Sequence, residues 1–357
     1  MRSILFASFG IALWACHGGG AGDDNNNFVD ASGSGTVDAG PPLEGTPYTI
    51  SWGSVSVASG DESTQCVVVQ LPNTTTIQVH QIHTTTSTAT HHVILYRDND
   101  PAAVVQSTPA PCQPFTGALN PSGMIGPVMI TQKQDDQLTL PDGVAYQFAA
   151  NQFIRIEMHY INTTDLPLTA TETTTFYAAD PATITDQADL LFIGSPDINI
   201  PAGQSFTLHQ FFKPGATETF LGAKIFAITG HEHKLGTGVV VKTGTSASDP
   251  AMTTVYDPMP FQWSEPATTN HNPTFGIPAG GGFDFTCTYD NTMGASAVKF
   301  GESATDEMCF FWAYYYPANG SHVCVHTNQV GNLNVCCPAA AGDQTATLVC
   351  NMISQGN

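Results

Sequence analysis

Five histidines and one methionine in this chain could hold metal ions. They occur in the order His91-His92, His159, His231-Glu-His233 and Met308. This order suggests two separate three-ligand sites, one of three imidazoles and one of two imidazoles and a thioether. Thioether sulfur is a soft ligand that suits Cu(I) and offers little to zinc or magnesium. The residue types therefore predict two copper ions per chain.

The His-x-His pair needs a strand if both rings are to reach one ion. Side chains two apart on a strand project from the same face, so His231 and His233 can share a metal while Glu232 points away. The preceding residues fit such a strand, with the histidine face also carrying Ile225, Ala227 and Thr229. A His-x-His pair also arises by chance at a polar strand end, and that interpretation stays open for the pair taken alone.

Met308 begins a run of strand-forming residues, Met-Cys-Phe-Phe-Trp-Ala-Tyr. Alternation places Met308, Phe310 and Trp312 on one face and Cys309 on the other, where a disulfide would hold the strand from behind. A buried methionine is more often core filler than ligand. Its assignment as a ligand therefore depends on its neighbours.

The pair His91-His92 poses a geometric problem, because adjacent residues of a regular strand face opposite sides. Both rings can bind one ion only at a bulge or a strand end. The alternative is a chance pair on an exposed turn. His159 lies in Phe-Ile-Arg-Ile-Glu-Met-His-Tyr-Ile, where it shares a face with Arg155 and Glu157. We therefore expect His159 on a polar surface that lines a metal site open to solvent.

The rest of the chain predicts a β protein. Short runs rich in Val, Ile, Thr and aromatic residues alternate with Pro, Gly, Asn and Asp, and no amphipathic helix of useful length stands out. The prediction is an all-β fold of two tandem antiparallel β-sandwich domains, jelly-roll-like, with a metal cleft between them. A three-histidine domain would span residues 47–183 and a His-His-Met domain residues 184–351.

The N-terminal residues and the cysteines predict export. Residues 1–16 resemble a bacterial lipoprotein signal peptide with Cys16 as the lipidation site, and residues 17–46 have the composition of a flexible tether. The other eight cysteines (nine in all, less Cys16) suit disulfides in an oxidising compartment. We expect an outer-membrane lipoprotein, periplasmic or at the cell surface, that meets the membrane only through its lipid.

Charge excludes one class of partner. The net charge is −21, and Lys plus Arg total 9, so a nucleic acid or an anionic membrane surface is not expected to bind. The expected partners are a small-molecule substrate and a reductant, and the chain is expected to be a monomer.

The ligand segments resemble those of the type II copper, ascorbate-dependent monooxygenases, which include peptidylglycine α-hydroxylating monooxygenase and dopamine β-monooxygenase. Thr-Ala-Thr-His91-His92-Val-Ile-Leu-Tyr and Glu-Met-His159-Tyr are similar to the segments of the first copper. Gly-His231-Glu-His233-Lys-Leu-Gly and Ser-Ala-Thr-Asp-Glu-Met308-Cys resemble those of the second. The resemblance runs from about Pro47 to Tyr316.

The resemblance implies a mechanism and two disulfides. The copper of His231, His233 and Met308 would bind O2 and substrate and hydroxylate a C–H bond. The copper of the three other histidines would store and deliver an electron from ascorbate or another one-electron reductant. The implied disulfides are Cys66–Cys112 and Cys287–Cys309, whereas the pairing of Cys324, Cys336, Cys337 and Cys350 stays open.

Departures from the family bear on the substrate. Peptidylglycine enzymes bind the substrate carboxylate with an arginine two residues before the His-x-His pair and with an asparagine and a tyrosine after the methionine. Those positions hold Thr229, Phe310 and Trp312 here. None carries a positive charge, so we expect an apolar or aromatic substrate rather than a peptide. In those enzymes the residue two positions before the third histidine is commonly a glutamine. This chain has Glu157 there, a difference that bears on electron transfer.

Three other hypotheses remain. The first is a non-catalytic, extracytoplasmic copper-binding lipoprotein that uses the same ligands. The second is a surface protein whose histidines are incidental, which predicts no stoichiometric copper. The third is a zinc hydrolase, since three histidines and a water make a catalytic zinc site. It leaves Met308 and the second site unexplained.

Overall fold

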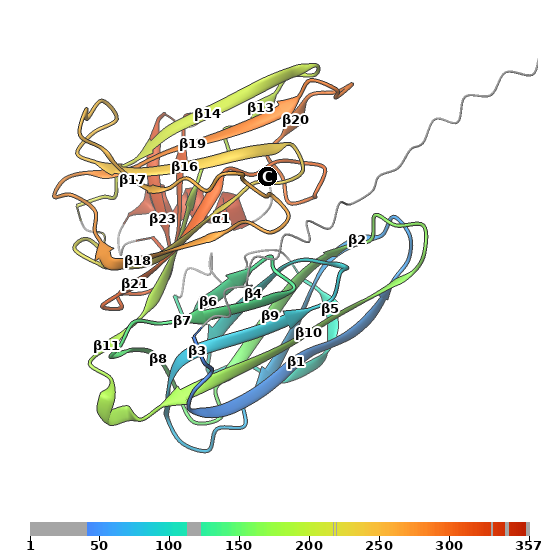
Figure 1. Cartoon of the computed structure of the whole chain (residues 1–357), viewed down its shortest axis with the longest axis vertical. Coiled ribbons are helices and arrows are strands. Elements are labelled where there is room, and N and C mark those ends of the chain that lie inside the picture. The colour runs from blue at the N-terminus through green and yellow to red at the C-terminus, as the bar shows by residue number, and fades with distance from the viewer. Residues whose placement is uncertain are drawn as a thin grey trace, which may run out of the picture. The chain divides into compact units, whose positions relative to one another are not determined.

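Nearly all the secondary structure of this chain is β-strand (Figure 1). The computed structural model describes residues 41–112, 123–216, 218, 220–329, 331–339 and 343–354. Four main sheets and one short pair of strands account for the strands of these residues. The prediction of an all-β fold of antiparallel sandwiches is confirmed.

Two sheets form the N-terminal half, which we define as residues 46–187. Sheet 1 has the order β1-β10-β3-β8-β11, with β7 also paired to β3. Its strands are β1 (Thr46–Val57), β3 (Ile77–Thr86), β7 (Asp135–Thr139), β8 (Val144–Phe148), β10 (Leu168–Ala179) and β11 (Asp186–Gln187). Sheet 2 has the order β5-β2-β9-β4-β6. Its strands are β2 (Glu62–Gln70), β4 (Thr90–Asp98), β5 (Gln106–Pro111), β6 (Ile125–Thr131) and β9 (Phe153–Ile161).

Two further sheets form the C-terminal half, residues 189–354. Sheet 3 has the order β18-β15-β21-β12-β22-β23. Its strands are β12 (Asp189–Gly194), β15 (Lys224–His231), β18 (Thr268–Phe275), β21 (Phe310–Tyr316), β22 (His322–Thr327) and β23 (Leu333–Cys337). Sheet 4, in the order β14-β19-β16-β17, contains β14 (Gln204–Phe212), β16 (Gly236–Gly244), β17 (Thr253–Tyr256) and β19 (Gly282–Asn291). The short pair is β13 (Asn199–Ile200) and β20 (Val298–Lys299).

Strand β21 shows how sequence alternation builds two cores. Phe310, Trp312 and Tyr314 belong to one buried cluster, together with side chains of the N-terminal half. The residues between them, Phe311 and Ala313, belong to a second cluster that lies wholly in the C-terminal half. Sheet 3 therefore buries both faces, and one of them forms a continuous core with the N-terminal half.

Among the described residues, helical structure is limited to a 3₁₀ turn, η1 (Pro181–Thr183), and the helix α1 (Gln344–Ser354). The sequence analysis did not predict α1. The described part of the chain contains no helix of sufficient length and apolar character to cross a membrane. The change from the N-terminal to the C-terminal sheets falls at Ala188, between β11 and β12. The domain limits predicted from the sequence remain predictions.

The segment predicted as a tether divides into two parts. Cys16 and residues 17–40 lie outside the described residues. Residues 41–46, by contrast, are bound to sheet 1. The carbonyl of Pro42 accepts a hydrogen bond from Gln81, the amide of Glu44 donates to the same side chain, and β1 begins at Thr46. Gln81 therefore holds this end of the segment, and the prediction of a tether over residues 17–46 stays a prediction.

Candidate metal centre

The first three histidines come together where β4 and β9 pair. His92 lies directly opposite His159, and the pairing shifts register between Thr90 and His92. This is the bulge that two adjacent ligands require, since it lets His91 and His92 turn toward one side. The Nδ1 atoms of His91 and His92 are 3.1 Å apart. Two ligand nitrogens bound to one ion at about 2.0–2.1 Å would have a similar separation.

The ring nitrogens of these three residues form a set suited to one ion. Ligand atoms of His91, His92 and His159 all lie within 4.8 Å of one another, and all three residues are buried. Two protonated nitrogens could not face each other at 3.1 Å, so at least one of the two Nδ1 atoms carries a lone pair. The geometry brings together the three residues that the sequence grouped.

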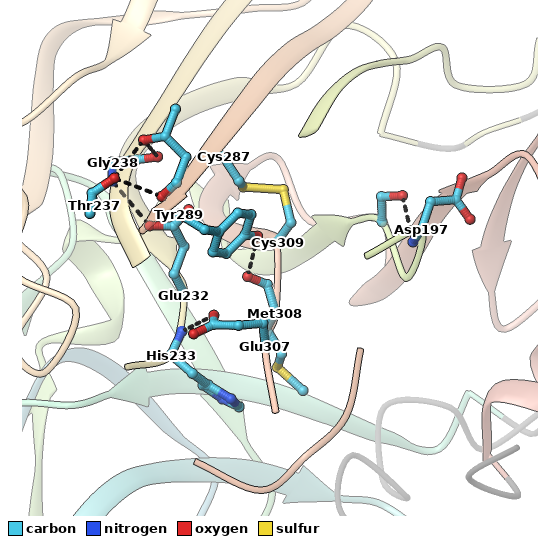
Figure 2. Close-up of a disulfide and its surroundings, with 12 residues drawn as sticks. Asp197, Glu232, His233, Thr237, Gly238, Cys287, Tyr289, Glu307, Met308 and Cys309 are labelled. Atoms are coloured by element: carbon cyan, nitrogen blue, oxygen red, sulfur yellow. Dashed lines mark hydrogen bonds between the residues drawn. A yellow bond between two sulfur atoms is a disulfide. The ribbon is translucent and has the colours of Figure 1, made fainter. Parts of the chain in front are cut away.

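His231 and His233 lie at the end of β15 and just beyond it. Their ring centroids are 5.1 Å apart. Glu232 turns away, and its carboxylate accepts a hydrogen bond from the amide of Gly238 (Figure 2). A bulge at Phe226 interrupts the alternation that the sequence predicted, so Ile225 faces the second core rather than the histidine side.

The segment that carries Met308 is held at three consecutive residues (Figure 2). The Glu307 carboxylate accepts hydrogen bonds from the backbone of His233 at 2.9 Å and Leu235 at 2.6 Å. The Tyr289 hydroxyl donates to the Met308 carbonyl at 2.8 Å. Cys309 forms a disulfide with Cys287. These contacts fix Met308, which is 1% exposed, beside the residues that follow β15.

All five imidazoles meet in one place. Between the two groups, ring centroids are 5.3 Å apart for His91 and His233, and 6.0 Å for His92 and His231. Within the first group they are 5.0–5.2 Å apart. We call this set the histidine chamber; its members are His91, His92, His159, His231 and His233.

The open cleft predicted between two separate sites is not found among the described residues. Exposure of the five histidines ranges from 0% to 7%. The prediction that His159 lines a solvent-open surface was also wrong, since this residue is 3% exposed. Glu62 covers the ring with a hydrogen bond and is itself bound to Ser303 and Ala304 of the C-terminal half.

Three of these rings each donate a hydrogen bond to a protein oxygen, which determines the nitrogen that faces the chamber. His159 donates from Nε2 to Glu62 at 2.8 Å, His231 from Nδ1 to the Gln132 side chain at 2.8 Å, and His233 from Nδ1 to the Asp306 carbonyl at 3.2 Å. The other nitrogen of each neutral ring therefore carries a lone pair. Such outer hydrogen bonds orient histidines that bind metals.

Buried ring nitrogens without a hydrogen-bond partner are consistent with a metal site. Among the described residues, the Nε2 atoms of His91, His231 and His233 are buried and meet no hydrogen-bond partner. A buried polar atom of this kind costs free energy unless something satisfies it. Five imidazoles with a thioether nearby form a donor set that fits copper.

Burial keeps the rings of His91, His231 and His233 neutral. Burial lowers the pKa of His91 and His231 well below the usual value of 6.5, and neighbouring imidazoles lower it further. Burial also lowers the pKa of His233 to about 4. The hydrogen bond from His159 lowers the pKa of Glu62 to about 2, so this carboxylate is ionised. Neutral imidazoles are the form that binds a metal ion without first releasing a proton.

Three residues were predicted to contact the substrate. In the structure their side chains are buried in the interior and do not form an accessible surface. Thr229, Phe310 and Trp312 are 1–4% exposed. Thr229 shares a hydrogen bond with Thr268, and Phe310 stacks on Phe192 at 4.8 Å. Trp312 lies 6.2 Å from His231, measured between ring centroids.

A small cavity adjoins the chamber. It is lined by His92, Ile94, Ile130, Gln132, Phe192, His231 and Trp312. Its free space of about 10 Å³ has room for roughly one water molecule. Apart from the two histidines and Gln132 the lining is apolar, in keeping with the apolar character predicted at Phe310 and Trp312.

The described cysteines all form disulfides. Cys66–Cys112 and Cys287–Cys309 are the pairs that the family resemblance implied. The pairs that the sequence left open are Cys324–Cys336 and Cys337–Cys350.

Two residues of the site escaped the sequence analysis. Glu62 and Gln132 hold His159 and His231 from 97 and 99 residues away in the chain. Neither belongs to a ligand motif, and no periodicity marks either one. Only the folded arrangement reveals them.

Comparison with known families concerns the C-terminal half. Residues 186–335 match the model of the C-terminal domain of copper type II ascorbate-dependent monooxygenases. This range contains His231, His233 and Met308, whereas the three other histidines lie outside it. No curated protein matches the chain.

Solved structures offer only distant likeness. The cowpea mosaic virus top component is 10% identical, with 81% of this chain and 96% of that chain covered and a TM-score of 0.31. The major capsid protein P2 of bacteriophage PM2 is also 10% identical, with 77% and 100% covered and a TM-score of 0.29. Likeness at this level carries no argument about function.

Proposed function

We propose that this chain is a copper-dependent monooxygenase of the type II, ascorbate-dependent family. The observation that carries the proposal is the chamber itself, where ring nitrogens of His91, His231 and His233 are buried without a protein partner. The family match over residues 186–335 supports the same function from sequence. Copper, when bound, would supply O2 activation and one-electron transfer.

Each ligand group has a place in this proposal. His231 and His233, with Met308 beside them, would hold the copper that meets O2 and substrate, because a thioether favours Cu(I). His91, His92 and His159 would hold the copper that receives electrons. The overall reaction balances as R–H + O2 + 2 e⁻ + 2 H⁺ giving R–OH + H2O, with ascorbate or another one-electron reductant as the electron source.

The lining of the site supports an apolar or aromatic substrate. Phe192, Phe310 and Trp312 form a stacked group beside His231. An organic molecule is too large for a cavity with room for about one water, so substrate entry requires part of the interface between the halves to open. The four disulfides support an exported protein. Lipidation at Cys16, an outer-membrane location and a monomeric state belong to the same proposal.

One observation favours a second function, that of a non-catalytic copper-binding lipoprotein. The five histidines are almost fully buried, and the adjoining cavity does not admit an organic substrate. A protein that only retains copper needs no such access.

Oxygen consumption separates the two functions. The copper-loaded protein would be supplied with ascorbate and a panel of small aromatic and aliphatic compounds, and ¹⁸O2 incorporation into product would be measured. A hydroxylated, labelled product that disappears in His231→Ala and in His159→Ala supports the monooxygenase. Stoichiometric copper without oxygen-dependent product supports the binding protein instead.

A further inference from the structure

One aromatic side chain separates the histidine chamber from solvent. Trp263 lies in residues 257–267, which join β17 to β18 (Figure 1) and which we call the cover segment. The centroid of its ring is 6.2 Å from that of His91, and the two ring planes are inclined by 32°. Trp263 is partly exposed, whereas His91 is 7% exposed. The tryptophan therefore has the chamber on one side and solvent on the other.

The strands on either side place the cover segment at the chamber. The first residue of β18, Thr268, lies opposite Thr229 of β15, which comes two residues before His231. At the end of β17, the Tyr256 hydroxyl donates a hydrogen bond to the Ala267 carbonyl at 2.9 Å. This bond closes the base of the segment, so both of its ends lie near His231.

Between its ends the cover segment has few attachments. Residues 257–267 form no backbone–backbone hydrogen bond with any described residue, and three of them are prolines, which have no N–H to donate. Phe261 packs against the second buried cluster, and the Gln132 side chain donates a hydrogen bond to the Trp263 carbonyl at 3.2 Å. The segment can thus move off the chamber without breaking a strand pairing.

The other covers of the chamber are held more firmly. Glu62 covers His159 and accepts two hydrogen bonds from the loop of residues 303–307, which a disulfide follows at Cys309. Separation of the two halves would expose the aromatic side chains of β21 that are buried in the core shared by the halves. Exposing such rings to water is unfavourable. Movement of the cover segment exposes none of them.

We infer that the cover segment is the entrance to the histidine chamber and that Trp263 is the residue that closes it. An organic molecule reaches the chamber when Trp263 moves off His91. The inference rests on the proposed function only in requiring that such a molecule enter. Apolar side chains line the way in, since Met259 is 82% exposed and Phe261 and Trp263 are partly exposed. These side chains favour a small aromatic or apolar molecule over a charged one.

Chemical labelling of the histidines tests the entrance without metal. The full chain, freed of metal, would be treated with diethyl pyrocarbonate, a small organic reagent that acylates neutral imidazole. Peptide mass spectrometry would give the labelling rate at each histidine. His231 and His233 report on the chamber, because their Nε2 atoms are buried and meet no described hydrogen-bond partner. His209, whose side chain is 52% exposed, serves as the reference for the reagent.

Trp263→Ala should raise the labelling rates of His231 and His233 at least about tenfold, because the ring no longer closes the entrance. Phe275→Ala is the matched control. Phe275 is a partly buried aromatic residue at the opposite end of β18, where its ring centroid lies 4.6 Å from that of His271. This variant should leave the chamber rates unchanged. Chamber rates in Trp263→Ala equal to those of the unaltered protein would overturn the inference, and so would an equal rise in both variants.

His326 distinguishes an opened entrance from a loosened fold. It is 5% exposed and lies in β22, which three strands of sheet 3 separate from β18. Its labelling rate should be the same in Trp263→Ala and in the unaltered protein. A rise at His326 parallel to that in the chamber would show general loosening and would refute the role of Trp263.

The labelling result does not depend on turnover. Entry controlled by Trp263 without oxygen-dependent product would keep the entrance and reject the monooxygenase. Product formation together with labelling that Trp263→Ala does not change would keep the monooxygenase and reject the entrance.

Discussion

Replacement of Met308 by leucine tests whether its sulfur binds metal or only fills space. Met308 is 1% exposed, and truncation to alanine would leave a cavity and cost about 2–5 kcal/mol. Leucine preserves the volume, so Met308→Leu should cost less than about 1.5 kcal/mol of stability. The affinity for a second Cu(I) should nevertheless fall at least about tenfold, equivalent to about 1.4 kcal/mol, because only the soft ligand is lost.

Met158→Leu provides the matched control. Met158 is 0% exposed and precedes His159 directly, but it packs in the core of the N-terminal half, where its sulfur accepts a weak hydrogen bond from Thr90. Cu(I) affinity would be measured by competition with a chelator, and stability by urea denaturation with the disulfides intact. We expect similar stability losses in the two variants and a loss of Cu(I) affinity in Met308→Leu alone. Equal affinities would show that Met308 is core filler.

Two further predictions concern a buried carboxyl group of sheet 1 and a disulfide of the C-terminal half. Burial raises the pKa of Glu172 from 4.5 to about 7. Between pH 4.5 and pH 7 the unfolded chain therefore ionises this carboxyl while the folded chain keeps it protonated. The free energy of unfolding should fall by about 3 kcal/mol as the pH rises from 4.5 to 7. Glu172→Gln should remove that fall, and urea denaturation of both proteins at pH 5 and pH 8 would measure it. An equal fall in the two proteins would contradict the prediction. Replacing both Cys287 and Cys309 by serine should lower the free energy of unfolding by about 3 kcal/mol, because the two cysteines are 22 residues apart in sequence. The change should also weaken Cu(I) binding, because it releases the segment before β21. Unchanged Cu(I) affinity in a folded variant would show that Glu307 and Tyr289 suffice to hold Met308.

Local patterns in the sequence predicted the strands that carry the ligands. The run after Met308 alternates in the structure as it does in the sequence, with Phe310 and Trp312 on one side of sheet 3 and Phe311 on the other. The bulge needed by His91 and His92 also occurs. These features depend on neighbours within a few residues, and strand geometry makes such neighbours predictable.

The same reasoning failed where a bulge or a distant segment decided the outcome. Ile225 was assigned to the histidine face, but the extra residue at Phe226 shifts the register before Ala227. Glu157 and Arg155 suggested an exposed face beside His159. In the structure Glu157 is fully buried and accepts a hydrogen bond from Tyr96, while Arg155 lies 3.9 Å from Asp98. Alternation tells which residues share a face, but not whether another sheet covers that face.

The separation of the two ligand groups was the least predictable property, and it matters most for the chemistry. Residue types predicted copper, because imidazole and thioether ligands have intrinsic preferences that do not depend on the fold. Glu62 and Gln132 form hydrogen bonds between the halves beside these groups, and their partners Ala304 and His231 lie 242 and 99 residues away. Neither residue binds metal in our assignment, so no ligand motif contains them. Chains with identical ligands could therefore hold the two ligand groups apart or together, according to the residues that join the halves.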